Sequence, residues 1–191
     1  SSANVETMYQ LMGGRIEAME FLIRADAKYL DIPLKDLPIK SNNLVDFDNL
    51  KAFIDANKSL GFVNLSKIAE LANAQRVDNA AYYTSQDICF CVAKYLPDVS
   101  DSTELNILEP SVGLGNFLPT LFVKYANAKK VNIDVFDIDS RSIELLKELL
   151  KTVVVPSNFN INIINADTLL YQFSKHYDIA IGNPPYMKFN G

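Results

Sequence analysis

Short apolar runs alternate with helix-spaced patterns along the second part of the chain. Helical spacing of apolar residues occurs over 117–125 and 143–153, and four β-rich runs, each ending in an acidic or polar residue, occupy residues 105–110, 131–139, 159–167 and 177–186. Strands separated by helices predict parallel βαβ units with right-handed crossovers. In such sheets ligands bind outside the carboxyl ends of the strands, so the four polar endings are expected to face one site.

The first part of the chain shows only helical spacing and carries no functional motif. We therefore predict a helical amino-terminal region over residues 1–80 and an α/β domain over residues 81–191. The apolar positions that define three predicted helix faces are Ile16, Met19, Ile23 and Leu30, then Phe47, Leu50, Phe53 and Ile54, then Ile68, Leu71, Ala72 and Gln75.

The stretch "TSQDICFCVAKYL" predicts a helix at the start of the α/β domain. Thr84 is its expected N-cap, with Asp87 three residues later. Cys89 and Cys91 project about 200° apart around a helix axis, so they are not expected to form a disulfide. The buried face is expected to consist of Ile88, Cys91, Val92, Tyr95 and Leu96.

Composition narrows the class of protein. The 191 residues are 49% apolar and 21% charged, enough to bury a core, and no apolar run approaches the roughly 20 residues of a bilayer span. No signal peptide is recognisable, so we expect a cytoplasmic protein without a membrane partner. The net charge of -5 argues against a chain that binds nucleic acid over its whole surface. With a single histidine, no metal site is expected.

The first three strand endings have the chemistry of a nucleoside site. "EPSVGLGNF" places Gly113 and Gly115 in a tight turn between strand and helix, where a ligand can approach the backbone. Asp137 follows the second strand, where a carboxylate can accept bonds from both ribose hydroxyls. Asp139 is the expected N-cap of the next helix. Asp167 ends the third run and could accept the exocyclic amine of an adenine ring. Together these endings predict a pocket for an adenosine-bearing ligand without a polyphosphate.

The fourth ending, "NPPY", predicts a site for a planar amine. The Asn183 side-chain oxygen and the Pro184 carbonyl can accept its two hydrogens, and Pro185 holds the turn rigid. Such acceptors stabilise the positive charge that develops on the nitrogen during its attack. Tyr186 offers a flat face on which an extruded base can stack.

Five ordered motifs between residues 76 and 186 carry a resemblance to a known family: "YYTSQDI", "LEPSVGLGNF", "VFDID", "NAD" and "GNPPY". The chain resembles the amino-terminal catalytic part of an adenine-N6 DNA methyltransferase of the γ arrangement, as found in bacterial restriction–modification systems. The resemblance implies a partial Rossmann-like methyltransferase sheet, parallel with four strands present, preceded by a helical domain. It also implies methyl transfer to the N6 amine of a flipped adenine.

The resemblance further implies S-adenosylmethionine as the cofactor. The catalytic residues that it implies are Asn183, Pro184, Pro185 and Tyr186. The residues that it places at the cofactor are Thr84, Glu109, Pro110, Ser111, Val112, Gly113, Gly115, Asp137, Ile138 and Asp167.

Two other functions remain open at this point. Protein-glutamine methyltransferases are similar in having a helical amino-terminal domain and an "NPPY" that holds a side-chain amide, but they usually have an Asp-Leu-Gly run where this chain has Glu109, Pro110 and Ser111. The other alternative is a subunit that binds cofactor or DNA without turnover.

The position of "NPPY" close to the last residue predicts a fragment truncated after that motif. Only four strands of an expected seven can be counted, and no basic domain that could read bases is present. We therefore expect double-stranded DNA to be bound through a recognition domain absent from this chain, and the fragment alone to be inactive on DNA. The exposed edge of the fourth strand could pair with a second copy in a homodimer.

Overall fold

The computed structural model describes residues 47–73, 84 and 86–184. The chain forms two compact units, Ser1–Tyr83 and Thr84–Gly191, and each is described by itself. No helix in the described ranges is long and apolar enough to cross a membrane.

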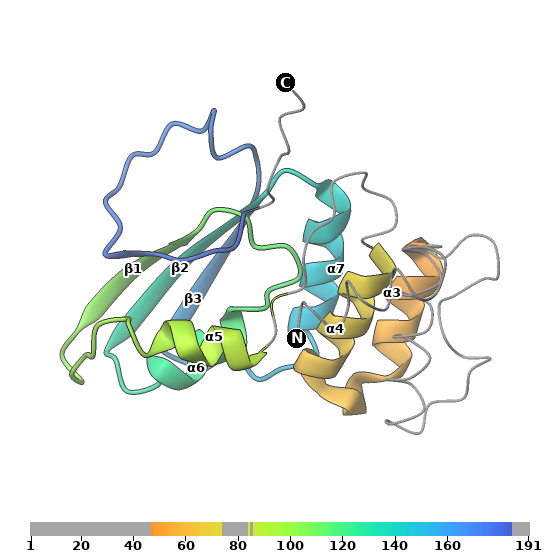
Figure 1. The fold of residues 1–191 in the computed structure, drawn as a ribbon, viewed down its shortest axis with the longest axis horizontal. Coiled ribbons are helices and arrows are strands. Elements are labelled where there is room, and N and C mark those ends of the chain that lie inside the picture. Colours follow the sequence, from red (N-terminus) through yellow and green to blue (C-terminus); the bar gives the residue numbers. More distant parts are fainter. Residues whose placement is uncertain (1–46, 74–83, 85, 185–191) are drawn as a thin grey trace, which may run out of the picture. The chain divides into compact units, whose positions relative to one another are not determined.

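The second unit is built on a four-stranded parallel sheet. Its strands are β1 (Glu104–Glu109), β2 (Lys130–Asp137), β3 (Phe159–Asn165) and β4 (Ile179–Ala180). The order across the sheet is β3-β2-β1-β4, with every neighbouring pair parallel (Figure 1). The predicted α/β fold with four parallel strands is confirmed. The fourth strand, expected over 177–186, is only two residues long, although Asp178 and Ile181 extend its bonding to β1.

Two helices cross one face of this sheet, as right-handed connections require. Helix α6 (Leu118–Lys124) joins β1 to β2, and α7 (Ser140–Leu150) joins β2 to β3 (Figure 1). The whole predicted α6 face is buried: Phe117, Leu118, Leu121, Phe122 and Tyr125. On α7 the predicted Ile143 and Leu146 are buried with Leu145 and Leu149, whereas the predicted Leu150 and Val153 are only half-buried.

Helix α5 (Gln86–Ala93) corrects two predictions. It begins two residues after Thr84, so Thr84 is not its N-cap. Its buried stripe contains Cys89 and Ala93, not the predicted face: Ile88, Cys91 and Tyr95 are exposed. The Gln86 side-chain amide and the Cys89 thiol both donate to the Asn116 carbonyl, at 2.9 and 3.4 Å. These two bonds turn the side of α5 that carries Gln86 and Cys89 toward the rest of the unit. The two cysteines point to opposite sides, as expected.

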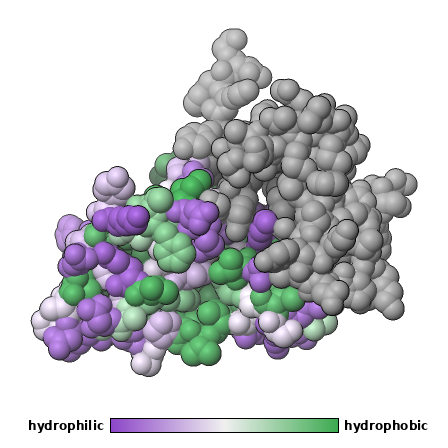
Figure 2. Space-filling model, turned by 60° about the horizontal axis from the view of Figure 1, so that its bottom comes forward, coloured by the Kyte–Doolittle hydropathy of each residue, from purple (hydrophilic) through white to green (hydrophobic). Residues whose placement is uncertain are grey.

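Several apolar side chains of this helix layer are therefore exposed. Figure 2 brings forward the lower side of Figure 1 and shows apolar residues interspersed with polar ones on that face. The exposed apolar residues of α5, α6 and the turn after α5 are Ile88, Phe90, Tyr95 and Val123.

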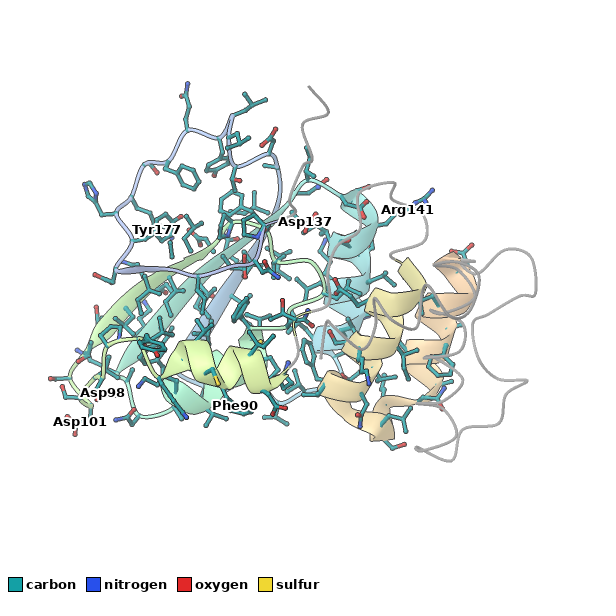
Figure 3. The ribbon with its side chains drawn as sticks, viewed as in Figure 1. Phe90, Asp98, Asp101, Asp137, Arg141 and Tyr177 are labelled. Atoms are coloured by element: carbon teal, nitrogen blue, oxygen red, sulfur yellow. The ribbon has the colours of Figure 1, made fainter. Side chains whose placement is uncertain are left out.

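The chain returns from β3 to β4 across the opposite face of the sheet, through residues 166–178 (Figure 1). This irregular segment is held by contacts with β2. Tyr177, labelled in Figure 3, donates its hydroxyl to Asp134 at 2.6 Å. Lys175 forms a 2.7 Å ion pair with the same carboxylate. Tyr171 meets Phe136 edge to face at 4.8 Å between ring centroids. Both faces of β2 are thus covered.

The described part of the first unit is helical, as predicted. Helix α3 (Phe47–Ala56) leads through a short 3-10 turn (Lys58–Leu60) into α4 (Gly61–Asn73). The predicted inward residues Leu50, Phe53, Ile54 and Ile68 are buried. The predicted face of Ile16, Met19, Ile23 and Leu30 lies outside the described residues, as do Gln75 and the side chains of Leu71 and Ala72.

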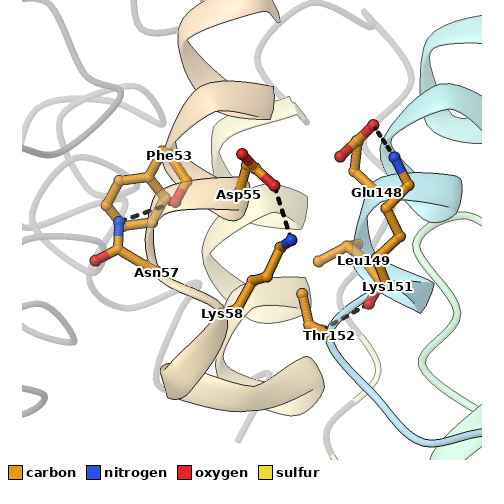
Figure 4. Close-up of polar contacts among 8 residues, drawn as sticks. All are labelled: Phe53, Asp55, Asn57, Lys58, Glu148, Leu149, Lys151 and Thr152. Atoms are coloured by element: carbon orange, nitrogen blue, oxygen red, sulfur yellow. Dashed lines mark hydrogen bonds and ion pairs between the residues drawn. The ribbon is translucent and has the colours of Figure 1, made fainter.

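Side chains close the ends of helices in each unit separately (Figure 4). In the first unit, the Asn57 side-chain amide donates to the Phe53 carbonyl at 2.8 Å, at the end of α3. In the second unit, the Thr152 hydroxyl donates to the Leu149 carbonyl at 2.6 Å after α7. Both carbonyls also accept a backbone N–H, from Asn57 and Thr152 respectively, so each side chain adds a second donor to the same oxygen.

Candidate active site

The carboxyl ends of all four strands meet at one edge of the sheet. Glu109 ends β1 and Asp137 ends β2, and the aligned register of the parallel strands brings these ends together. Asp167 and Asn183 follow shortly after β3 and β4. Figure 3 shows Asp137 at this edge and Asp98 and Asp101 at the opposite end of the sheet. The predicted convergence of the polar endings is therefore present.

The turn after β1 is closed by its own backbone. The Val112 N–H donates to the Phe136 carbonyl at 2.7 Å, which ties the turn to β2, and Gly115 N–H donates back to the Val112 carbonyl at 2.9 Å. Gly113 and Gly115 have φ angles of 54° and 82°, in the left-handed region that glycine adopts without strain. This explains why the two glycines stand there.

Asp137 joins this glycine turn to the end of β2. One carboxylate oxygen accepts the Gly113 N–H and the other accepts the Asp139 N–H, both at 2.9 Å. Burial raises the pKa of Asp137, while these two N–H donors act in the opposite direction. Each carboxylate oxygen can accept a second hydrogen bond, so the group keeps capacity for a ligand hydroxyl.

Asp139 caps helix α7, as predicted. Its side chain accepts the Arg141 N–H at 3.1 Å and the Ser142 hydroxyl at 2.9 Å. Two aspartates only two residues apart therefore have different structural partners: Asp137 binds the glycine turn, and Asp139 binds the first turn of a helix.

Glu109 is a buried carboxyl group beneath the turn, with 2% of its surface exposed. It accepts the Ser111 N–H at 2.9 Å. Burial raises the pKa of Glu109 to about 8, the Ser111 N–H opposes the shift, and the charge of Asp137 adds to it. At neutral pH the group therefore holds a proton. The Ser111 hydroxyl oxygen is buried and has no hydrogen-bond partner among the described residues.

Gly182 lies against Glu109, a role that the sequence reading did not assign. A Cβ atom at position 182 would stand 2.5 Å from the Glu109 Oε1 atom and 3.3 Å from the Pro110 ring. The only sequence indication was its position directly before "NPPY". The contact places the buried carboxyl group next to the backbone that leads to Asn183.

We expect Gly182→Ala to displace either Glu109 or the end of β4, because 2.5 Å is shorter than real Cβ contacts. The expected result is a loss of folding stability of roughly 1–3 kcal/mol, as for overpacking elsewhere. Urea unfolding of the variant measures it. Gly61→Ala is the control for a Cβ atom that meets no neighbour, since nothing lies within 4 Å of that position. Its φ of 81° adds backbone strain of its own. Equal stability of Gly182→Ala and the parent chain would contradict the close approach.

The Asn183 side chain is hydrogen-bonded to Thr84, the first residue of the same unit. Its side-chain N–H donates to the Thr84 hydroxyl at 3.0 Å, across 99 residues of sequence. Thr84 is buried. Pro184 follows Asn183 on the surface, and the predicted Pro185 and Tyr186 lie outside the described residues.

The end of β3 and the residue after Asp137 complete the edge. Asn165 donates its side-chain amide to the Asp137 and Ile138 carbonyls, at 2.9 and 3.2 Å. Ile138 is largely exposed, and Asp167 is half-buried and accepts the Leu169 N–H at 2.9 Å. The sequence reading missed the bracing role of Asn165, which its position at a strand end indicates only weakly.

Comparisons with known proteins identify methyltransferases as similar to this chain. No protein-family model matches the chain. It is 31% identical over 126 residues to the type II methyltransferase M.VspI of Vibrio sp. (strain 343), covering 65% of this chain and 30% of that protein. It is 29% identical over 116 residues to the type II methyltransferase M.CvrRI of Paramecium bursaria Chlorella virus XZ-6E, covering 61% of this chain and 27% of that protein. The predicted resemblance to methyltransferases is confirmed, over less than one third of each relative's length.

A solved structure shares the fold. A putative class I S-adenosylmethionine-dependent methyltransferase from Listeria monocytogenes superposes with a TM-score of 0.55 at 17% identity, over 85% of this chain and 58% of that chain. The predicted Rossmann-like methyltransferase fold is thereby confirmed.

Proposed function

We propose that this chain forms the catalytic part of a DNA methyltransferase that transfers a methyl group from S-adenosylmethionine to the N6 amine of a flipped adenine. One observation carries the proposal: a glycine turn, a ribose-type carboxylate at Asp137 and the amide of Asn183 meet at one edge of a parallel sheet. The similarity to type II methyltransferases supports a DNA substrate over a protein glutamine.

The residues present fit the proposed cofactor. The Ser111 hydroxyl is buried without a partner in the described part of the chain, and glycines line the turn. The bound cofactor supplies an activated methyl group on a positively charged sulfur. In our assignment Glu109 and the turn surround its methionine part, with the turn formed by Pro110, Ser111, Val112, Gly113 and Gly115.

The other two strand ends are assigned to the nucleoside part of the cofactor. Asp137 is proposed to accept the ribose hydroxyls, because each of its oxygens has a lone pair beyond its backbone bond. Ile138, largely exposed beside it, offers an apolar surface for the adenine ring. Asp167 is proposed to accept the exocyclic amine of that ring.

Asn183 and Pro184 are proposed to hold the target amine through their oxygens. Two acceptors directed at the N–H bonds increase the electron density on the nitrogen and stabilise the charge that develops there, without a strong base. Pro185 and Tyr186 complete the site in this proposal, as a rigid turn and a stacking surface. DNA is proposed to be held by a recognition domain outside this chain, since its net charge is -5.

A methyl-transfer assay with labelled cofactor tests the proposal. The full-length protein is incubated with duplex DNA or with glutamine-containing peptides, and the products are digested and identified by mass spectrometry. N6-methyladenine is the expected product. Label on glutamine or on cytosine would overturn the proposal, and so would the absence of cofactor binding by calorimetry.

The pH dependence of stability provides a separate test of Glu109. Its pKa is raised from 4.5 to about 8 in the folded chain. As the pH rises, Glu109 therefore loses its proton in the unfolded chain before it does so in the folded chain. The contribution of protonated Glu109 to the free energy of unfolding is complete below pH 4.5 and is lost as the pH rises through about 8. We expect Glu109→Gln, which cannot ionise, to lose less stability than the parent chain between pH 5 and 8. The difference is on the order of a few kcal/mol, at about 1.4 kcal/mol per pH unit.

Urea unfolding at the two pH values measures this difference. Glu104→Gln is the matched control, because Glu104 begins the same strand at the opposite end of the sheet and is exposed. Identical pH dependence in Glu109→Gln and Glu104→Gln would contradict a proton held on Glu109.

A further inference from the structure

The bond between Thr84 and Asn183 connects two parts of the site that the sequence separates by 99 residues. Thr84 had been expected at the cofactor. In the structure its hydroxyl oxygen accepts the side-chain N–H of Asn183 at 3.0 Å, and only 6% of its surface is exposed. Among the described residues, Asn183 is the partner of this buried hydroxyl.

The helix that follows Thr84 is anchored close to the glycine turn. Gln86 and Cys89, in the first turn of α5, both donate to the Asn116 carbonyl, and Asn116 comes directly after Gly115. The start of α5 is therefore anchored to the same loop that forms the glycine turn. Thr84 lies two residues before this anchored helix start.

The backbone before Asn183 is held as well. Ile181 N–H donates to the Leu108 carbonyl at 2.9 Å, and Gly182 is packed against Glu109. The remaining freedom is the rotation of the Asn183 amide, whose two ends differ chemically. The amide oxygen can accept hydrogen bonds from an amine, whereas the amide NH2 group is itself a donor and cannot accept them.

We propose that Thr84 is a positioning residue for Asn183. By accepting the Nδ2 hydrogen, it holds the amide in the orientation that leaves Oδ1 as the end available to the amine of the substrate. The inference rests on the proposed function of Asn183, and it gives Thr84 a role distinct from cofactor contact. Misplacement of a group that contacts the reacting atom costs up to about 10²-fold in rate.

Three variants test the pair. Thr84→Val keeps the shape of the side chain and removes the acceptor, whereas Thr84→Ser keeps the hydroxyl. Thr120→Val is the matched control, because Thr120 is equally buried and its hydroxyl has no partner among the described residues. Comparison with this control separates loss of the specific bond from the general cost of replacing a buried threonine.

The first measurement is solvent exchange of the Asn183 side-chain NH2 group, followed by NMR on the nitrogen-15-labelled chain and assigned with Asn183→Asp. We expect slow exchange in the parent chain, Thr84→Ser and Thr120→Val, and at least several-fold faster exchange in Thr84→Val. The second measurement is methyl transfer by the full-length protein. We expect kcat to fall roughly 10-fold or more in Thr84→Val and to recover in Thr84→Ser, with cofactor Kd unchanged.

Unchanged exchange and kcat in Thr84→Val would overturn the inference. A weaker cofactor Kd with unchanged Asn183 exchange would also overturn it, because Thr84 would then act on the cofactor. If the parent protein binds cofactor but leaves adenine unmethylated, the proposed function fails. The NMR comparison still decides whether Thr84 holds the Asn183 amide.

Discussion

Replacing Asn183 with alanine is expected to lower the rate of methyl transfer by about 10² or more, while cofactor affinity stays nearly intact. The physical reason is that the amide oxygen would act on charge that develops on the amine only during the reaction. In the structure Asn183 donates to Thr84 and makes none of the described bonds that hold the glycine turn. Its removal is therefore expected to leave the cofactor residues in place.

Single-turnover methyl transfer and calorimetric titration of the cofactor measure the two quantities separately. Asn127→Ala is the control variant, because Asn127 lies in an exposed turn after α6, away from the carboxyl ends of the strands. If Asn183→Ala loses rate and cofactor affinity together, Asn183 shapes the cofactor site instead of acting on the amine.

Replacing Asp137 with alanine is expected to weaken S-adenosylmethionine binding by roughly 1–3 kcal/mol, the usual cost of leaving hydrogen-bonding groups without a partner. Two losses contribute. The ribose hydroxyls lose their proposed acceptor, and the Gly113 and Asp139 N–H groups lose the carboxylate that they contact.

Asp139→Ala is the natural control for this variant. Asp139 caps α7, so its replacement is expected to cost about 1 kcal/mol of folding stability without a comparable loss of cofactor affinity. Calorimetry measures affinity, and urea unfolding measures stability for both variants. An unchanged Kd in a folded Asp137→Ala chain would exclude the ribose assignment.

Local sequence patterns predicted the elements whose structure depends on local chemistry. The helix cap at Asp139 and the buried face from Phe117 to Tyr125 follow from side chains within one or two helical turns. The short β4 shows where such a pattern misleads. Its β-rich run ends in Gly182, Asn183 and Pro184, and proline has no N–H to contribute to the sheet.

Contacts between distant segments could not be predicted in this way. Helix α5 has apolar residues on more than one side, so the spacing of these residues did not indicate which side is buried. It could not reveal that Gln86 and Cys89 bind the Asn116 carbonyl. The bond from Asn183 to Thr84 is likewise invisible to any local pattern. The DNA partner and pairing through the edge of β4 stay predictions.

The glycine turn also has a thermodynamic consequence. Because Val112 and Gly113 donate to β2 through the Phe136 carbonyl and the Asp137 carboxylate, the turn is closed by the protein's own bonds. Ordering one backbone residue costs about 1–2 kcal/mol of conformational entropy, and here folding has already met that cost. A preorganised turn leaves more of the gross interaction energy to appear as affinity. Binding at this turn is then expected to carry little further cost for ordering the loop.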